Sequence, residues 1–549
     1  MIRLPPSLER VIQWLDATPE ANYVHIERLL KAQPGDRMAE GMMLAVAWHA
    51  REGDTHKAQR IIDERRHHFP LLPIPLLGVE CGLLAQDNRK EEVGTALVQH
   101  GLLAYDMGLS DLGLEAMSTG MIMDVLNSYN RILHDPPAIL KCCQRYEHAA
   151  QQLGVSSTVR ARSGKRTRIG LVVPCLVDNT VAFSNRVMFF ARYMDTSQYE
   201  LFVYVTESPT PSAPLLPICC ATPPTTQRAP AYLNELRERG VPVRLASLEK
   251  TQRGRAQELA AQVTRDGIDV LILQSGPTMV VDWLATRMAA STAKLQIHIG
   301  MPAFQSGIDA TLYDNAVNLE REGPFSPADA GEQLLVRRGT DIAAIDSAVP
   351  LSRQQFGIPQ DAVVLGTLSN HINRRLTEPF LTFIVRLLRK HPNAIYLAIG
   401  TLKAAPQLVA AFAAEGIEGR AIVVPPQRSP GCILKMLDIY LNEFPAGGSQ
   451  AVVEAIACGI PVVALRAGNT HHESVGADIV GDAFAIKGYD VHAYEQQASD
   501  WITAPETRRS AGRAMRNRAL SEFSVANFVD RVCRLGSEIV EDKKLARTA

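Results

Sequence analysis

Short apolar runs alternate with helical stretches twice along this chain, and this alternation constrains the fold more than any other feature. In the first block, a strand-like apolar run at Arg168–Pro174 is followed by a helical stretch at Ala182–Met194 and a second apolar run at Tyr199–Thr206. Two parallel strands need a crossover between them, and that crossover is usually a helix. We therefore expect an open, parallel α/β sheet in this block.

The same rhythm continues through the rest of the first block. Seven prolines crowd residues 209–230 and predict a surface loop, because proline fits neither a helix interior nor a central strand. Beyond this loop the pattern predicts two helices, Ala256–Asp266 and Val281–Ala290, and three strands, Val270–Gln274, Leu295–Gly300 and Ala310–Asp314.

A second block repeats the alternation and predicts a complete second doubly wound sheet. Its expected strands are Ala362–Ser369, Ala394–Gly400, Ala421–Pro425, Asp438–Glu443 and Pro461–Leu465, and its expected helices are Pro379–Lys390, Pro406–Glu415 and Gln450–Cys458. Helices over Tyr494–Trp501 and Pro505–Ile539 should cover the two sheets or cross back over them. Two Rossmann-like domains facing a cleft form the architecture called GT-B, in which ligands bind beyond the carboxyl ends of the strands.

The first 157 residues carry helical periodicity and almost no strand signal. Two helices that end near Pro34 and Pro70 repeat at a spacing of 36 residues, close to the roughly 34-residue tetratricopeptide period. A degenerate tetratricopeptide-like array and an irregular helical bundle both remain open, as do a peptide-binding groove and a packing platform. The chain thus divides into an all-helical domain at 1–157, a first Rossmann-like domain at 165–350, and a second at 351–549 with the C-terminal helices.

The charge and composition of the chain exclude some classes of binding partner. The 57 basic and 58 acidic residues give a formal charge of −1, so no global excess attracts nucleic acid, and any nucleotide must be held by a local site. No apolar run reaches the roughly 18 residues of a membrane-spanning helix, and the first residues lack a secretory pattern. Nine cysteines without regular CxxC pairs fit reduced thiols. We expect a cytoplasmic protein that is not integral to a membrane.

The sharpest motif is a glycine turn between a strand and a helix, within residues 441–465. Gly447 and Gly448 let a ligand approach the backbone, Ser449 suits a helix N-cap, and the helix that opens at Gln450 directs free N–H groups toward that ligand. A diphosphate suits this place, and the carboxylate of Glu454 could bind both hydroxyls of a ribose. A plain turn, with Ser449 only capping the helix and Glu454 in solvent, is the alternative.

Residues 454–463 read Glu-Ala-x-Ala-x-Gly-x-Pro-Val-Val, which resembles the donor-binding signature of GT-B glycosyltransferases. Residues 364–400 and 267–276 resemble the O-GlcNAc transferase family and the related bacterial adhesin glucosyltransferases. Residues 295–314 add that family's Gly-x-Pro turn and its two aspartates five apart, Asp309 and Asp314. The resemblance covers roughly residues 165–480, and helical repeats ahead of two sheets are also that family's arrangement.

The resemblance implies which residues bind the donor. Arg374 or Arg375 would replace the family's lysine on the donor diphosphate, since arginine bonds phosphate oxygens in pairs. Asn370 lies in the same loop, and His371 beside it would contact phosphate or sugar, or be exposed. Ser449, Gln450 and Ala451 stand where the O-GlcNAc enzymes have His-Thr-Thr, and Glu454 stands where they have Asp.

The catalytic groups are less well defined. The family has a histidine after the first strand, whereas this chain offers only Asp178 there, as a general base or as an ordinary turn residue. His298, in the strand before a Gly-x-Pro turn, is a candidate base or a donor to the leaving phosphate, or else a core histidine. The chain has no Asp-x-Asp motif, and the pair His471 and His472 lacks further ligands at metal spacing. We therefore expect transfer without a metal or other cofactor.

The resemblance predicts inverting transfer from a UDP-sugar to an acceptor, a protein side chain handled by the N-terminal helices. Two alternatives stay open: a GT-B enzyme of polysaccharide or lipid-linked glycan synthesis, and a catalytically degenerate relative that only binds. The sugar, the acceptor and the oligomeric state are open, and a homo-oligomer is compatible with the sequence.

Overall fold

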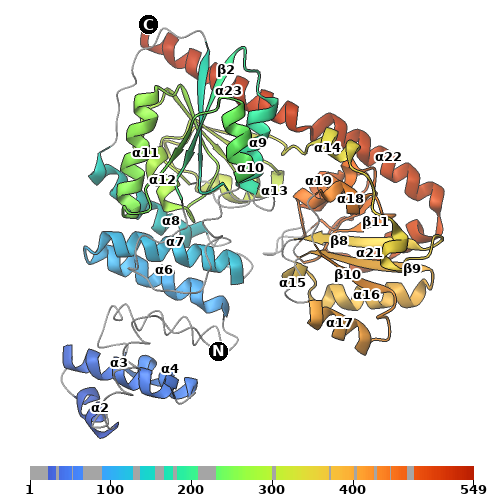
Figure 1. Ribbon diagram of the computed structural model, residues 1–549, viewed down its shortest axis with the longest axis horizontal. Coiled ribbons are helices and arrows are strands. Elements are labelled where there is room, and N and C mark those ends of the chain that lie inside the picture. Colours follow the sequence, from blue (N-terminus) through green and yellow to red (C-terminus); the bar gives the residue numbers. More distant parts are fainter. Residues whose placement is uncertain are drawn as a thin grey trace.

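The computed structural model contains two parallel sheets preceded by a set of helices (Figure 1). It describes residues 23–31, 36–51, 54–65, 90–127, 136–154, 166–176, 182–207, 230–298, 304–369, 372–400, 405–425, 429–445, 447–466 and 475–548. The predicted α/β class with two doubly wound sheets is confirmed. The proline-rich segment 209–229 and the stretch between the first two predicted domains, residues 158–164, lie outside the described residues.

The first sheet has seven strands in the order β3-β2-β1-β4-β5-β6-β7, and all neighbours are parallel. Its central strands are apolar runs buried on both faces, as expected for a parallel sheet covered by helices. The strands are β1 Thr167–Val173, β2 Tyr199–Val205, β3 Val243–Leu245, β4 Val270–Leu273, β5 Ala293–Ile297, β6 Ala310–Tyr313 and β7 Glu332–Leu335. The edge strands β3 and β7 are not among the predicted strands.

Helices cover both faces of the first sheet. On one face Val172 and Leu271 pack against α11 (Gln252–Asp266) and α12 (Val280–Met288). On the other, Ile169 and its neighbours pack against α9, α10 and α23, whose bounds are Ala182–Tyr193, Pro230–Glu238 and Val525–Thr548. We call this sheet, its helices and α13 (Ala316–Glu322) the first lobe.

The second sheet has five parallel strands in the order β10-β9-β8-β11-β12. They are β8 Val363–Ser369, β9 Ala394–Gly400, β10 Ala421–Val424, β11 Ile439–Leu441 and β12 Val462–Val463. The sheet and its helices form the second lobe, with α14 Ile342–Ser347, α15 Ile372–Arg375, α16 Glu378–Lys390, α17 Ala405–Ala414, α18 Pro430–Leu434, α19 Gln450–Ala457, α20 Gly476–Val480, α21 Val491–Thr503 and α22 Pro505–Glu522.

The C-terminal helix returns to the first lobe, where Phe528 and Val529 of α23 are buried in the core (Figure 1). The predicted single helix over 505–539 is interrupted at residues 523–524, between α22 and α23. There the two connections between the lobes lie side by side: Thr340 N–H donates to the Phe523 carbonyl at 2.8 Å, and Val525 N–H donates to the Thr340 carbonyl at 3.1 Å. The C-terminal part of the predicted second domain therefore packs on the first sheet. The domain boundaries otherwise stay a prediction.

The described residues before β1 form helices only: α2 Tyr23–Leu30, α3 Asp36–Arg51, α4 Thr55–Arg65, α6 Lys90–Asp106, α7 Ser110–Asn127 and α8 Pro136–Leu153. Helices α7 and α8 join the core of the first lobe. Ser118 Oγ donates to the Thr278 carbonyl at 2.5 Å, and Arg287 pairs with Glu147 at 2.6 Å. A tetratricopeptide character of these helices stays a prediction.

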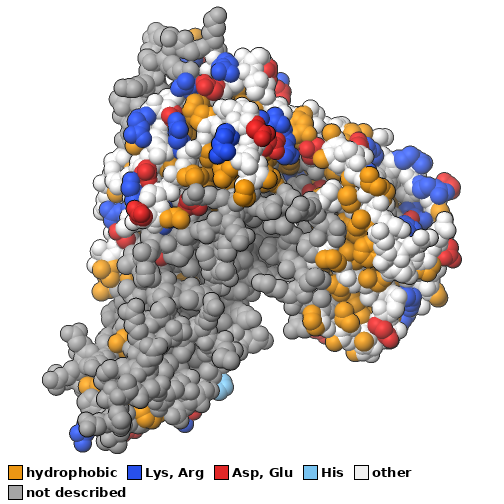
Figure 2. Space-filling view, viewed as in Figure 1, with side chains coloured by type: hydrophobic (Ala, Val, Ile, Leu, Met, Phe, Trp, Pro, Cys, Tyr) orange, Lys and Arg blue, Asp and Glu red, His pale blue; other side chains and the backbone are white. Residues whose placement is uncertain are grey.

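Basic and acidic side chains are interspersed over the described part of the surface in Figure 2, which fits the formal charge of −1. Across the described residues, the structure contains no helix with both the length and the apolar character needed to cross a membrane.

Candidate functional site

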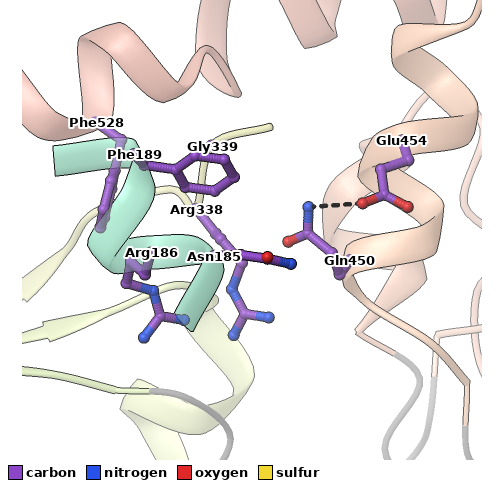
Figure 3. A pocket seen from close by; sticks show the side chains of 8 residues that line it. All are labelled: Asn185, Arg186, Phe189, Arg338, Gly339, Gln450, Glu454 and Phe528. Atoms are coloured by element: carbon purple, nitrogen blue, oxygen red, sulfur yellow. Dashed lines mark hydrogen bonds between the residues drawn. The ribbon is translucent and has the colours of Figure 1, made fainter. Parts of the chain in front are cut away.

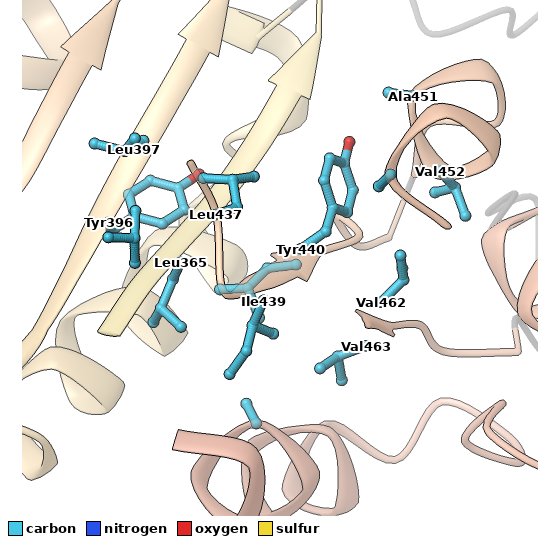
Figure 4. Packing of buried hydrophobic residues seen from close by; sticks show 14 of the residues in the cluster. Leu365, Tyr396, Leu397, Leu437, Ile439, Tyr440, Ala451, Val452, Val462 and Val463 are labelled. Atoms are coloured by element: carbon cyan, nitrogen blue, oxygen red, sulfur yellow. The ribbon is translucent and has the colours of Figure 1, made fainter. Parts of the chain in front are cut away.

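The start of α19 is held against the second sheet by its apolar residues. Val452 and Ile456 are fully buried, and Figure 4 shows Ala451 and Val452 beside the residues of β11 and β12. This packing leaves Gln450 and Glu454, which are one helical turn apart, on the remaining face. The helix follows the carboxyl end of β11, as predicted, so its first N–H groups point beyond the end of the sheet.

The glycine turn before α19 is shaped by Asn442. A Cβ added at Gly447 would lie 2.6 Å from Asn442 Nδ2, and one added at Gly476 would lie 1.9 Å from the same atom. The side chain of Asn442 therefore fills the space between the two glycines. We expected a ligand to approach the backbone at Gly447, but in the structure the side chain of Asn442 occupies the space beside this glycine.

Two of the predicted phosphate-binding groups meet around a carboxylate that the sequence reasoning missed. Glu443 is fully buried, and its Oε2 accepts a hydrogen bond from the Gly448 N–H at 3.1 Å. The same oxygen lies 3.9 Å from Arg375 Nη1. Burial raises the pKa of Glu443, while Arg375 opposes this shift. The structure thus brings Gly448 and Arg375 near each other, with the Glu443 carboxylate in contact with both.

Ser449 occupies the N-cap position of α19, as predicted, but its side chain makes no capping hydrogen bond to the helix. Its backbone already has helical angles, φ −105° and ψ −57°, which do not place the hydroxyl over the first turn. The hydroxyl instead accepts a long hydrogen bond, 3.5 Å, from Nη1 of Arg338, which follows β7. Ser449 thus links the two lobes.

Gln450 and Glu454 line a pocket whose opposite wall belongs to the first lobe (Figure 3). Gln450 Nε2 donates to Glu454 Oε1 at 3.2 Å. Burial raises the pKa of Glu454 to about 7, and the hydrogen bond from Gln450 opposes this shift. The first lobe contributes Asn185, Arg186 and Phe189 of α9, Arg338 and Gly339 of the connection after β7, and Phe528 of α23. Glu454 lies in a pocket between the lobes and not in open solvent.

Arg338 is anchored by a buried chain of charges beneath this pocket. It forms an ion pair with Asp314, whose Oδ1 lies 3.8 Å from His298 Nδ1. On its other side, His298 Nε2 lies 3.1 Å from Glu322 Oε2. Burial by itself would lower the pKa of His298, but the two carboxylates outweigh burial and raise it to about 9. Burial would raise the pKa of Asp314, but Arg338 and His298 hold it well below its ordinary value.

The two carboxylates therefore favour the protonated form of His298, which is enclosed between them. Its ring stacks on Tyr313 with centroids 4.8 Å apart, and its side chain is fully enclosed. A histidine that acts as a general base must be unprotonated and must reach the acceptor. This environment fits a group that positions Asp314 and, through Asp314, Arg338. The core alternative for His298 accounts for its position better than the catalytic one.

Most of the remaining predicted residues lie outside the part of the chain that the structure describes. Asp178, Asn370 and His371 lie outside the described residues, as do the side chain of Arg374 and the histidines at 471–472. Asp309 precedes β6 whereas Asp314 follows it, so the two aspartates lie at opposite ends of that strand. Within the described ranges, no three His, Cys, Asp or Glu side chains are grouped so that they could hold a metal ion.

Comparison of the sequence with protein-family models and with curated proteins finds no match. Solved structures do share the fold. An O-GlcNAc transferase mutant from Thermobaculum terrenum has a TM-score of 0.57 at 16% identity, over 99% of each chain. A glycosyltransferase from Rickettsia africae has a TM-score of 0.52 at 14% identity, over 69% of this chain and 99% of that one. The chain therefore has the predicted GT-B fold.

Proposed function

We propose that this chain is a cytoplasmic glycosyltransferase that moves a sugar from a UDP-sugar to an acceptor. The observation that carries this proposal is the pocket between the lobes, lined by Gln450 and Glu454 on one side and by Arg338 on the other. Both α19 and the segment with Arg338 follow the carboxyl ends of parallel strands. Open α/β sheets bind nucleotides beyond these ends. The shared fold with solved glycosyltransferases supports the same assignment.

In the proposed complex the donor diphosphate lies at the start of α19. The N-terminus of a helix carries partial positive charge and free N–H groups, both of which favour a phosphate. Arg375 and Arg338 approach this helix start from the two lobes. The ribose hydroxyls would bind Glu454, which lies one turn further along the helix. Asn370, His371 and Arg374 stay predicted donor contacts.

The proposed reaction is a single displacement. An acceptor oxygen or amide nitrogen forms a bond to the anomeric carbon while the bond from that carbon to the diphosphate oxygen breaks. UDP leaves with the electron pair, the acceptor proton passes to a base, and the configuration inverts. The helix start and the arginines would stabilise the leaving diphosphate, so the proposal needs no metal. Asp178 stays the candidate base.

We assign the acceptor to the protein class, with the N-terminal helices handling it, as the resemblance implies. Helices α7 and α8 are built into the core of the first lobe, so a polypeptide bound to them would have a fixed position relative to the pocket. A glycan acceptor is the alternative, and it predicts activity on a small oligosaccharide. Mass spectrometry of co-expressed proteins, searched for an added hexose or N-acetylhexosamine, distinguishes the two.

One observation favours a second candidate, nucleotide binding without transfer. The carboxylate of Glu443 already accepts the Gly448 N–H and lies near Arg375, where the donor phosphate is proposed. Such an arrangement suits a relative that has lost transfer. Donor turnover separates this candidate from the first, because only an enzyme releases UDP from its UDP-sugar.

The experiment that tests the proposal is a thermal-shift panel of UDP, GDP, dTDP and their sugars, followed by detection of released UDP. A ligand at 100 times its dissociation constant stabilises the folded state by about 2.7 kcal/mol. We expect UDP and one or more UDP-sugars to raise the melting temperature, and the productive sugar to be consumed. No response to any of these nucleotides would contradict the proposal.

A further inference from the structure

Arg186 is a buried cation whose hydrogen-bonding capacity is incompletely used. It lies on α9, its residue is only 4% exposed, and it lines the pocket between the lobes. Among the described residues, no acceptor is within hydrogen-bonding distance of its buried Nη1. Burial and the nearby positive charge of Arg338 lower the pKa of Arg186 to about 9, against the opposing effect of Asp314. A buried charge without full pairing is costly, so a protein that keeps one commonly uses it.

The neighbour of Arg186 does not relieve this imbalance. Arg338 is itself a cation, and its buried Nε also has no acceptor within the described structure. The carboxylate of Asp314 interacts electrostatically with three cations, Arg186, Arg338 and His298. His298 also interacts with the carboxylate of Glu322. Three cations thus share two carboxylates, and two of these cations, Arg186 and Arg338, line the pocket. An anion would complete their pairing.

The position of these arginines points to where the anion comes from. Figure 3 shows the amide of Asn185 pointing from the first lobe toward Gln450 at the start of α19, with the side chain of Arg338 next to Asn185. Arg338 already reaches the hydroxyl of Ser449, the residue before that helix. We infer that Arg186 and Arg338 form an anion subsite that takes an oxygen of the donor diphosphate. The inference rests on the proposed function and deepens it, because the donor would then be held by both lobes.

The test is calorimetric titration of uridine, UMP, UDP and pyrophosphate into the full-length protein and its variants. Arg186→Gln removes the charge, and Arg186→Lys keeps the charge but loses the paired donors of guanidinium. The control is Arg192→Gln on the same helix, because Arg192 pairs with Glu235 and does not line the pocket. We expect Arg186→Gln to weaken UDP and pyrophosphate binding at least about tenfold. Uridine binding should not change, Arg186→Lys should be intermediate, and the control should match the wild type.

Thermal unfolding without ligand shows whether Arg186 is simply structural. Removal of an incompletely paired buried charge should leave the melting temperature of Arg186→Gln equal to or above that of the wild type. A lower melting temperature together with equally weakened uridine binding would assign Arg186 to the fold and overturn the inference.

Two further outcomes separate the inference from the function on which it rests. If the wild type binds UDP and Arg186→Gln binds it within twofold as tightly, the inference fails while the proposed function stands. The same holds if Arg186→Gln leaves UDP binding alone but raises the KM for an acceptor, since the anion would then belong to the acceptor. If the wild type binds neither UDP nor pyrophosphate, both fail.

Discussion

The carboxylate of Glu443 accepts a hydrogen bond from the backbone N–H of Gly448 at 3.1 Å, at the helix start where a donor phosphate is proposed. A phosphate and a carboxylate at one N–H group would repel each other. The protein therefore places a carboxyl group of its own at this position, and the charge of that group should affect how tightly a donor binds.

Glu443→Gln should tighten UDP binding about three- to tenfold. The amide oxygen can still accept the Gly448 N–H, while the negative charge next to the diphosphate is removed. Because burial already raises the pKa of Glu443, the neutral side chain should also be tolerated by the fold. Calorimetric titration with UDP measures the effect. Glu495→Gln, which changes a partly buried carboxylate paired with the exposed Arg386, is the control. Weaker UDP binding would instead mean that Glu443 contacts the donor directly.

Glu454→Ala should weaken UDP binding at least about tenfold and leave pyrophosphate binding unchanged. The reason is that Glu454 is proposed to bind the ribose, and a hydrogen bond to a charged group contributes about 1.5–3 kcal/mol. The affinities for UDP and for pyrophosphate can be compared by letting each ligand displace a fluorescent nucleotide from the protein. Glu415→Ala, at an exposed ion pair of the same lobe, should behave as wild type. Equal loss of both ligands would place Glu454 at the phosphate or assign it to the fold.

His298→Gln should destabilise the protein by about 3–5 kcal/mol, because it leaves Glu322 and Asp314 without their shared cation. The pKa of His298 is raised from 6.5 to about 9 in the folded state. Its contribution to stability is therefore fully present below pH 6.5 and is lost as the pH rises through about 9. Urea unfolding of the wild type between pH 6 and 10 should show this loss, at up to about 1.4 kcal/mol per pH unit.

The variant distinguishes this histidine from other groups that titrate in the same range. His298→Gln should remove that part of the pH dependence, while His492→Gln, at an exposed position of α21, should keep it. Parallel stability curves for His298→Gln and the wild type would show that His298 is not a cation in the folded protein.

Gly447→Ala should destabilise the second lobe by about 1–3 kcal/mol, since its Cβ would lie 2.6 Å from Asn442 Nδ2. Asn442 cannot move aside freely because Gly476 encloses the same side chain. UDP binding should weaken as well, since the turn sets the position of α19. Gly419→Ala in the same lobe adds a Cβ with no atom within 4 Å and serves as the control. Urea unfolding that shows equal stability for the two variants would argue against this packing.

The sequence predicts the two sheets well because their central strands are apolar on both faces. The predicted strand Ala362–Ser369, for example, is one residue longer than strand β8, which covers Val363–Ser369. The edge strands β3 and β7 are missed because they are short and only partly buried, so they lack the continuous apolar signal. The break between α22 and α23 is missed because residues 523–524 carry neither glycine nor proline. That break is set by the pairing of Thr340 with the chain near Phe523, which is a tertiary contact.

The candidate site is predicted only in part, because its residues come from both lobes and only those close together in the sequence form a recognisable pattern. The residues of α19 follow each other in the sequence, so Gly448, Gln450 and Glu454 are found by local reasoning. Their partners across the pocket come from the other lobe, and no local pattern connects them. The sequence held one indication that Arg186 is special. This arginine directly precedes the apolar residues Val187, Met188 and Phe189 in a helix that packs on a sheet. A charge on such a face indicates either a buried pair or a ligand.

The most direct test of the central claim, that a nucleotide sugar binds between the two lobes, is hydrogen–deuterium exchange of the full chain with and without saturating UDP. A nucleotide bound between the lobes should slow exchange in two separate segments at once. One is the turn and first turn of α19, residues 447–452, and the other is the connection at 336–340 that carries Arg338. Slower exchange confined to one lobe, or at neither segment despite saturation, would contradict the account.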